Sequence, residues 1–122
     1  MSHEWRPVVG IEVEAVDGAA RAGRVTTPRG SFATPCFMPV GTRGAVKALS
    51  AADLDDLGVE VQLANTCRLM LRPGADVVAA LGGLHRFEGW DGHVLTASGG
   101  YQVFSLEPKV DDDGATFRST YD

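Results

Sequence analysis

The chain has 122 residues, 44% of them hydrophobic and 22% charged, and this composition predicts a globular protein with one small core. Its formal net charge of −5 argues against a protein that grips a nucleic-acid backbone unaided, because such affinity comes mainly from Lys and Arg. No apolar run approaches the roughly 20 residues of a membrane span and the first residues lack the pattern of a signal peptide, so we expect a cytoplasmic protein with no membrane partner.

The first part of the chain has the alternation and the turn residues of antiparallel strands. Apolar and acidic side chains alternate in Val8–Ala15, as in a half-exposed strand. Asp17-Gly18 and Pro28-Arg29-Gly30 are turn sequences. Three strands are therefore expected, at residues 8–15, 21–27 and 31–34. We predict that residues 1–34 form a small antiparallel β-meander.

From Pro35 onward the pattern changes to that of a parallel α/β unit. Cys36–Val40 is apolar throughout, which favours a strand that is covered on both faces. Ser50, with Asp53 three residues later, predicts the start of a short helix that closes at Gly58. The next expected elements are a strand at 59–63, a helix that opens at 72–74 and ends at 82–83, and a buried strand at Val94-Leu95.

This alternation of strands and helices is typical of a (β/α)₈ barrel or of a doubly wound sheet. A closed barrel of eight strands requires about 250 residues, roughly twice the length of this chain. The expected fold class is therefore α/β, with residues 35–122 forming the first βα units of an incomplete (β/α)₈ TIM-type barrel. We expect a fragment or a truncated product, which would expose unpaired strand edges and apolar faces.

A Ser-Gly-Gly turn directly after the strand at Val94-Leu95 has the clearest chemical content. Gly99 and Gly100 lack the Cβ atoms that would keep a backbone away from a flat ligand. Tyr101 then offers a stacking face, and Gln102 offers a hydrogen-bond donor and an acceptor. The alternative is an ordinary glycine turn between two strands.

Four blocks of sequence, in the same order, resemble the tRNA-guanine transglycosylases, which exchange a guanine base in tRNA for a 7-deazaguanine. The blocks are Thr34-Pro-Cys-Phe-Met-Pro-Val-Gly-Thr42, Asn65-Thr-Cys-Arg-Leu-Met-Leu-Arg-Pro-Gly74, Gly82-Gly-Leu-His-Arg-Phe87 with Trp90-Asp-Gly92, and Leu95-Thr-Ala-Ser-Gly-Gly-Tyr-Gln-Val-Phe-Ser-Leu106. The similarity begins at about Gly23 and continues through the last residue.

The resemblance implies a site in which two aspartates serve as nucleophile and as proton-transfer group. The first follows the strand that leads into Tyr101-Gln102, and Ala97 stands at that position here. The second belongs to a later barrel loop, beyond these residues. An alanine methyl can neither accept a proton nor attack carbon, so we expect no catalytic residue and no turnover from this chain alone.

The other site residues that the resemblance implies are present. Tyr101 would stack on the purine, and Gln102 would orient the loop or bind RNA. The remaining substrate-binding residues are Ser98, Gly99 and Gly100, which would shape the loop, and Val40 and Asn65, which would line the pocket. The residues by themselves leave structural alternatives open: Tyr101 as a core residue, Gln102 as a solvated side chain and Asn65 as a loop cap.

The family's Asn-Thr-Tyr-His block is Asn65-Thr66-Cys67-Arg68 here, so a small thiol and a permanent cation replace an aromatic ring and an imidazole. Cys67 as a catalytic thiol is a further alternative, since the adjacent cation of Arg68 would favour a thiolate. Neither the two cysteines nor the three histidines have a metal-binding spacing, so no metal site and no cofactor are expected in this chain. By the resemblance, a Cys/His cluster beyond these residues would hold a structural Zn²⁺.

The predicted function is that of a partial transglycosylase, which exchanges guanine for queuine or its precursor at the anticodon wobble position. The expected partners are tRNA, the 7-deazaguanine base and a second subunit in a homo- or heterodimer. The alternative is a non-catalytic accessory subunit of an active transglycosylase, which Ala97 and the Cys67-Arg68 pair favour over an intact enzyme. A third alternative is a fragment of an unrelated sugar-phosphate barrel. Such a barrel would have a glycine-rich phosphate loop near its C-terminal end, and that region lies beyond these residues, so the alternative stays open.

Overall fold

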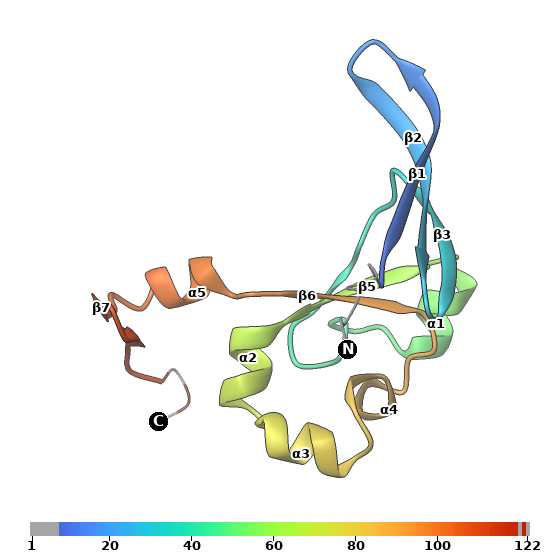
Figure 1. Cartoon of the computed structure of the whole chain (residues 1–122). Helices are drawn as coiled ribbons and strands as arrows, with labels where there is room; N and C mark the ends of the chain where they lie inside the picture. The colour runs from blue at the N-terminus through green and yellow to red at the C-terminus, as the bar shows by residue number, and fades with distance from the viewer. Residues whose placement is uncertain (1–7, 120, 122) are drawn as a thin grey trace, which may run out of the picture. The chain divides into compact units, whose positions relative to one another are not determined.

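The computed structural model describes residues 8–119 and 121 (Figure 1). The chain divides into two compact units, Met1–Met38 and Pro39–Asp122, which are described separately below. This division falls within a few residues of the predicted domain boundary between residues 34 and 35, which itself stays a prediction. None of the helices in the described part of the chain has the length and apolar character that a membrane crossing requires.

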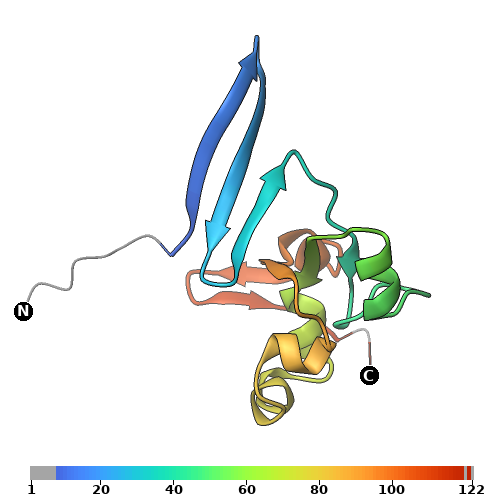
Figure 2. The ribbon, with the colours of Figure 1, turned by 90° about the vertical axis from the view of Figure 1, so that its right-hand side faces the viewer.

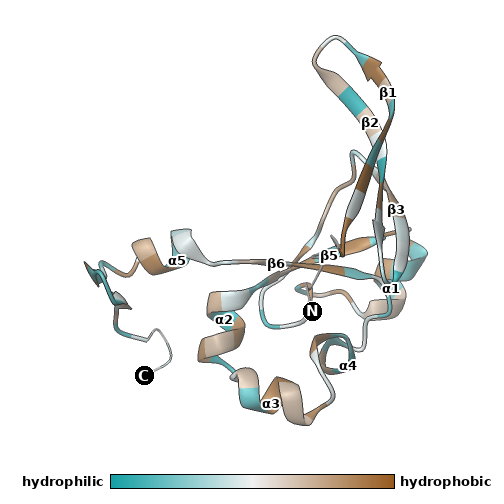
Figure 3. Ribbon diagram, viewed as in Figure 1, coloured by the Kyte–Doolittle hydropathy of each residue, from teal (hydrophilic) through white to brown (hydrophobic). Residues whose placement is uncertain are grey.

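The N-terminal unit is a three-stranded antiparallel sheet in the order β1-β2-β3, as the alternation and turn residues predicted. The strands are β1 (Gly10–Asp17), β2 (Ala20–Thr27) and β3 (Gly30–Thr34). The register pairs Ile11 with Val25 and Val25 with Phe32, so these three apolar side chains share one face of the sheet. Phe32 is buried, whereas β1 is exposed along its whole length, where Figure 3 shows its apolar residues in brown.

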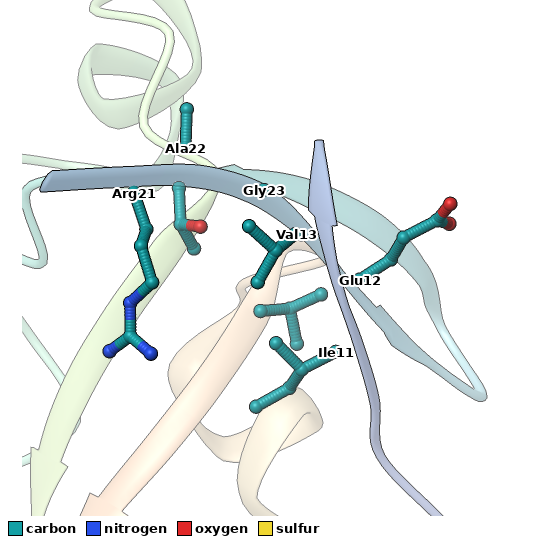
Figure 4. Close-up of a pocket in the computed structure, with 8 residues that line it drawn as sticks. Ile11, Glu12, Val13, Arg21, Ala22 and Gly23 are labelled. Carbon is teal, nitrogen blue, oxygen red and sulfur yellow. The ribbon is translucent and has the colours of Figure 1, made fainter. Parts of the chain in front are cut away.

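A close backbone approach explains the glycine in the middle of β2. A Cβ atom at Gly23 would lie 2.3 Å from the carbonyl oxygen of Glu12 on the neighbouring strand, so no larger residue fits there. A shallow pocket of about 360 Å³ lies on this face (Figure 4). Figure 4 shows Ile11 and Val13 on one side of β1 and Glu12 pointing to the other side. The lining is mainly aliphatic, with Arg21, Glu12 and Thr34 as its polar members.

The C-terminal unit contains a parallel sheet of three strands in the order β4-β5-β6. These are β4 (Val40–Gly41), β5 (Val61–Asn65) and β6 (His93–Ala97). Helix α1 (Ala51–Asp56) connects β4 to β5, and three helices connect β5 to β6. Because neighbours in the sheet are also neighbours in sequence, the arrangement is that of consecutive βα units. The described residues thus form three parallel strands rather than the eight of a closed barrel.

The prediction of a doubly covered strand at Cys36–Val40 is wrong. Only Val40 belongs to β4, and the side chain of Phe37 is 84% exposed. Pro35 and Pro39 flank the segment and have no N–H group to donate to a sheet ladder. Pairing therefore starts at the carbonyl of Pro39, which accepts a hydrogen bond from the backbone N–H of Leu63 at 2.9 Å.

Two of the predicted helix boundaries are confirmed by their capping groups. Ser50 caps α1 through a capping box, in which its hydroxyl accepts from the N–H of Asp53 and the carboxylate of Asp53 accepts from the N–H of Ser50. Helix α3 (Ala75–Ala80) begins after Gly74 and ends before Gly82, both of which have positive φ. The strand expected at 59–63 begins and ends two residues later, as β5.

Three short helices were not predicted, α2 (Thr66–Leu71), α4 (Leu84–Glu88) and α5 (Gly100–Phe104). All are below two turns in length, too short for a helical period to be visible in the sequence. Helix α4 leads to Trp90, which is only 2% exposed and donates its indole N–H to the carbonyl of His93 at 3.1 Å. Trp90 is therefore a packing residue of the C-terminal unit.

Beyond β6 the chain continues as helix α5 (Gly100–Phe104) and a hairpin of β7 (Lys109–Asp111) and β8 (Gly114–Thr116). Figure 2 shows the two hairpin strands side by side. The alternative of a glycine turn between two strands is wrong, because a helix begins at Gly100. The prediction of a buried strand at Val94-Leu95 is also wrong in part, since the side chain of Leu95 is 43% exposed.

A buried carboxyl group lies at the end of α4. Both carboxylate oxygens of Glu88 are inaccessible to solvent, and no described residue donates a hydrogen bond to them. Its Cγ packs near Gly44, where an added Cβ would lie 3.2 Å away. Burial raises the pKa of Glu88 from its ordinary value of 4.5 to about 7. The folded chain therefore binds a proton at Glu88 more tightly than the unfolded chain does.

We predict that the free energy of unfolding falls as the pH rises from about 4.5 to about 7, because the unfolded chain loses this proton first. In Glu88→Gln, which cannot ionise, this component should vanish, so the variant should be more stable than the unmodified chain above pH 7 and similar to it below about pH 4. Urea denaturation at a series of pH values measures both effects. Glu60→Gln removes an exposed carboxylate as the control. Identical pH dependence in Glu88→Gln and the unmodified chain would show that folding does not raise the pKa of Glu88.

Candidate functional site

The ends of the three parallel strands bring several of the predicted site residues together. Asn65 is the last residue of β5 and Ala97 the last of β6, and the two are register partners. Val40 of β4 pairs with Leu63, two residues before Asn65, and so lies on the same face of the sheet. Because the strands are parallel, their carboxyl ends share one edge, where α/β folds position their functional loops.

Asn65 caps a helix at this edge and keeps its amide N–H groups free of partners among the described residues. Its side chain is buried, and its Oδ1 atom accepts a hydrogen bond from the backbone N–H of Arg68 at 3.0 Å, which caps α2. The capping alternative for Asn65 is therefore confirmed, although the capped element is a helix rather than a loop. The amide nitrogen of Asn65 donates to none of the described residues, and so its two N–H donors are available to a ligand.

Gly99 brings the loop after β6 against the start of α2. Its φ of +80° is in the left-handed region, and an added Cβ would lie 2.4 Å from the Cβ of Cys67 and 3.4 Å from Oδ1 of Asn65. Only glycine combines this backbone conformation with such a close approach. The contact sets the Ser98–Gly100 turn beside Asn65, although the two loops are far apart in sequence.

Tyr101 and Gln102 stand in the first turn of α5. The ring of Tyr101 is 79% exposed, so the alternative of a core tyrosine is wrong. Gln102 is half-buried rather than fully solvated. It contributes to a small cavity of about 20 Å³ between α2 and α5, room for about one water molecule, which is lined by Cys67, Arg68, Leu71, Gln102, Ser105 and Leu106.

Two residues near this edge were considered for a catalytic role, Ala97 and Cys67. Ala97 ends β6 half-buried and presents only a methyl group to the edge. Cys67 is buried against Gly99, and none of the described residues forms a hydrogen bond with its thiol, which disfavours the alternative of a catalytic cysteine. Within residues 8–119 and 121, no group of three acidic, Cys or His side chains could hold a metal ion, and the family zinc site stays an expectation from the resemblance.

Sequence reasoning placed Asn65 in the pocket but missed helix α2, and so missed the fixed orientation of its amide. A partial signal was present, since an Asn directly ahead of a helical segment is a common N-cap residue, although Arg68 stands where a capping box would have Glu or Gln. Nothing in the sequence indicated that Gly99 would lie against Cys67. That contact depends on the pairing of β5 with β6.

Residues 17–122 match the family model described as queuine tRNA-ribosyltransferase. The chain is 55% identical over 115 residues to a queuine tRNA-ribosyltransferase of Brucella suis biovar 1, covering 93% of this chain and 30% of the relative. It is 56% identical over 108 residues to that of Gloeobacter violaceus, covering 87% and 29%, and 53% identical over 112 residues to that of Herpetosiphon aurantiacus, covering 90% and 29%. The chain thus spans about 30% of the length of the curated relatives it matches.

The two glycines of the turn give a matched pair of variants. We predict that Gly99→Ala lowers the free energy of unfolding by about 2 kcal/mol or more, because it adds a positive-φ penalty of about 1–2 kcal/mol to a clash with Cys67. Gly100→Ala should cost less than about 1 kcal/mol, since its nearest new contact is 3.8 Å away and its φ is not positive. Chemical denaturation of both variants measures the difference. Equal losses would show that Gly99 does not pack as described.

Proposed function

The chain belongs to the queuine tRNA-ribosyltransferase family, and on this premise we propose that its residues form the base-holding part of a tRNA base-exchange site. In the reaction, guanine leaves the anticodon wobble position and a 7-deazaguanine, queuine or its precursor, takes its place. The observation that carries the proposal is the meeting of Asn65, Ala97 and Gly99 at one edge of the parallel sheet. Tyr101 stands exposed immediately after that edge.

Each of these groups has a part in holding a flat purine. The exposed ring of Tyr101 would stack on the base, an interaction of about 1–3 kcal/mol. The two free amide donors of Asn65 would face the acceptor atoms of the base, with the amide held in place by its cap on α2. Val40, 53% exposed on the same face, would provide an apolar wall. Gly100, where the nearest atom to an added Cβ would be 3.8 Å away, would let the base approach the backbone closely.

Holding a base is not enough to exchange it. The reaction requires a nucleophile at the anomeric carbon and a group that moves protons to and from the bases. None of the site residues that the resemblance assigns to this chain carries an acid, because Ala97 occupies the position of the first aspartate. We therefore propose that these residues bind a base and, without a further segment or subunit, do not turn over.

A second candidate function is that of a non-catalytic partner subunit, favoured by the alanine at position 97. An exposed row of apolar side chains on the parallel sheet, Val40 and Leu95 on either side of Leu63, is compatible with association in a homo- or heterodimer. The two candidates share the base-holding site and differ in whether an active subunit must be present.

We predict that the purified chain incorporates labelled guanine into tRNA at no more than the background rate. Loss of one general acid or base typically costs about 10²- to 10⁴-fold in rate, and the resemblance assigns the second aspartate to a loop beyond these 122 residues. Ala97→Asp restores only one of the two acids, so it should also stay near background. A full-length relative in the same assay is the positive control. Guanine exchange well above background by the unmodified chain would refute the proposed inactivity.

We also predict that Tyr101→Ala weakens the binding of free guanine or queuine by about 5- to 150-fold, which corresponds to the loss of about 1–3 kcal/mol of stacking. Phe104→Ala is the matched control, because Phe104 is an equally exposed aromatic residue on the same helix, at 77% against 79% for Tyr101. Equilibrium dialysis with radiolabelled base measures both affinities. An equal effect of the two substitutions would remove Tyr101 from the base site.

A further inference from the structure

The two segments that meet at the carboxyl edge of the parallel sheet carry cations and no acids. Residues 61–75 and 92–106 contain Arg68 and Arg72 but no Asp or Glu, in a chain whose net charge is −5. Because Ala97 ends β6, neither segment supplies a carboxylate that could neutralise an arginine at this edge. The two segments are therefore positively charged within an acidic chain.

The backbone of Arg68 lies at the candidate site itself. Its N–H donates to Oδ1 of Asn65 at 3.0 Å. The backbone nitrogen of the preceding residue, Cys67, lies 3.1 Å from the position that a Cβ added at Gly99 would take. The first contact ties Arg68 to the end of β5, and the second holds this turn of α2 against the loop that follows β6. Arg68 thus belongs to the same edge as Asn65 and Ala97.

The side of Arg68 that faces α5 meets residues close to Tyr101. Arg68 lines the cavity of about 20 Å³ between α2 and α5 together with Gln102 and Ser105. Ser105 follows Tyr101 by one helical turn, and its N–H donates to the carbonyl of Tyr101 at 2.9 Å. The cavity has room for about one water molecule, too little for a larger anion. Arg68 is half-buried, however, so a part of it stays accessible to a ligand outside the cavity.

Arg68 and Arg72 differ in what their guanidinium groups contact. The guanidinium carbon of Arg72 lies 5.7 Å from the ring centroid of Tyr121, which is a cation–π arrangement. None of the described residues forms an ion pair, a side-chain hydrogen bond or a ring contact with the side chain of Arg68. A guanidinium group has five N–H donors and no acceptor, so those of Arg68 are available to an external anion.

We propose that Arg68 binds a phosphate group of the nucleotide whose base stacks on Tyr101. A guanidinium group can donate two parallel hydrogen bonds to one phosphate and neutralise part of its charge, which the amides of Asn65 and Gln102 cannot do. The inference rests on the proposed function and deepens it, because the ligand of this edge becomes a purine nucleotide rather than a base alone. It also gives a role to the cation that replaces the imidazole of the family's Asn-Thr-Tyr-His block.

Equilibrium dialysis of the full chain with radiolabelled guanosine, guanosine 5′-monophosphate and guanosine 3′-monophosphate measures the contribution of the phosphate. At least one monophosphate should bind about 10-fold more tightly than guanosine, as expected of a hydrogen bond between charged groups. In Arg68→Gln this preference should be lost, with the affinity for guanosine unchanged. Arg68→Lys keeps the charge without the planar fork, so it should retain a part of the preference.

Arg72→Gln is the matched control, because it makes the same charge change on the next turn of the chain, at the guanidinium that lies over Tyr121. It should leave the preference for the monophosphate unchanged. The inference is overturned if Arg72→Gln removes the preference as fully as Arg68→Gln does. It is also overturned if Arg68→Gln weakens the binding of guanosine and of the monophosphates by the same factor, as expected of a purely structural role.

The three ligands separate this inference from the proposed function. If the unmodified chain binds guanosine and both monophosphates equally, the base-holding site stands and the phosphate contact of Arg68 is wrong. If the unmodified chain binds none of the three ligands, the proposed function and the inference are both wrong.

Discussion

The in-register pairing of β5 with β6 is the constraint on which the candidate site depends. It places Asn65 directly opposite Ala97 and sets the Gly99 turn against Cys67, at the first turn of α2. A shift of one residue would turn Asn65 to the opposite face of the sheet and separate it from the loop. The buried core residues of this unit, among them Val61, Ala64 and Trp90, oppose such a shift, because they would have to leave their packed positions.

On the proposed function, the end of β6 keeps side chains that could bind a base but lacks the acid that the exchange reaction would require. Side chains suited to a purine, an exposed phenol ring and an oriented amide, stand near a residue that has no acid. On the proposed function, the affinity of this edge for a base would come from stacking and hydrogen bonds that an alanine does not disturb. The reaction, in contrast, would require acidic groups, and Ala97 provides none at its position. On this proposal, a family member would keep its base-holding side chains and lose its activity.

The sequence-based predictions were accurate for features that depend on residues close together in the chain, and less accurate for the others. The capping box of Ser50 and Asp53, the glycines that end α3 and the antiparallel meander were all predicted, because each depends on residues a few positions apart. The strand at Cys36–Val40 was wrong, since two prolines outweigh an apolar run when hydrogen bonds are required. Helices α2, α4 and α5 were missed because they are too short to show a period. Within the site, the sequence resemblance named Tyr101, Gln102 and Asn65 but did not predict their exposure or the helix that Asn65 caps.

The sequence by itself determined the local caps and turns, the family and the missing acid at position 97, because these properties belong to single side chains or to short segments. Only the tertiary structure decided that Tyr101 is exposed, that the carboxyl group of Glu88 is buried with no hydrogen-bond partner among the described residues, and that Gly99 contacts Cys67. Each of these depends on contacts between distant segments, which form when burial of apolar surface draws β5, β6 and their helices together. Local sequence does not encode that packing. The residues of the candidate site could therefore be named from the sequence, whereas their exposure and contacts could not.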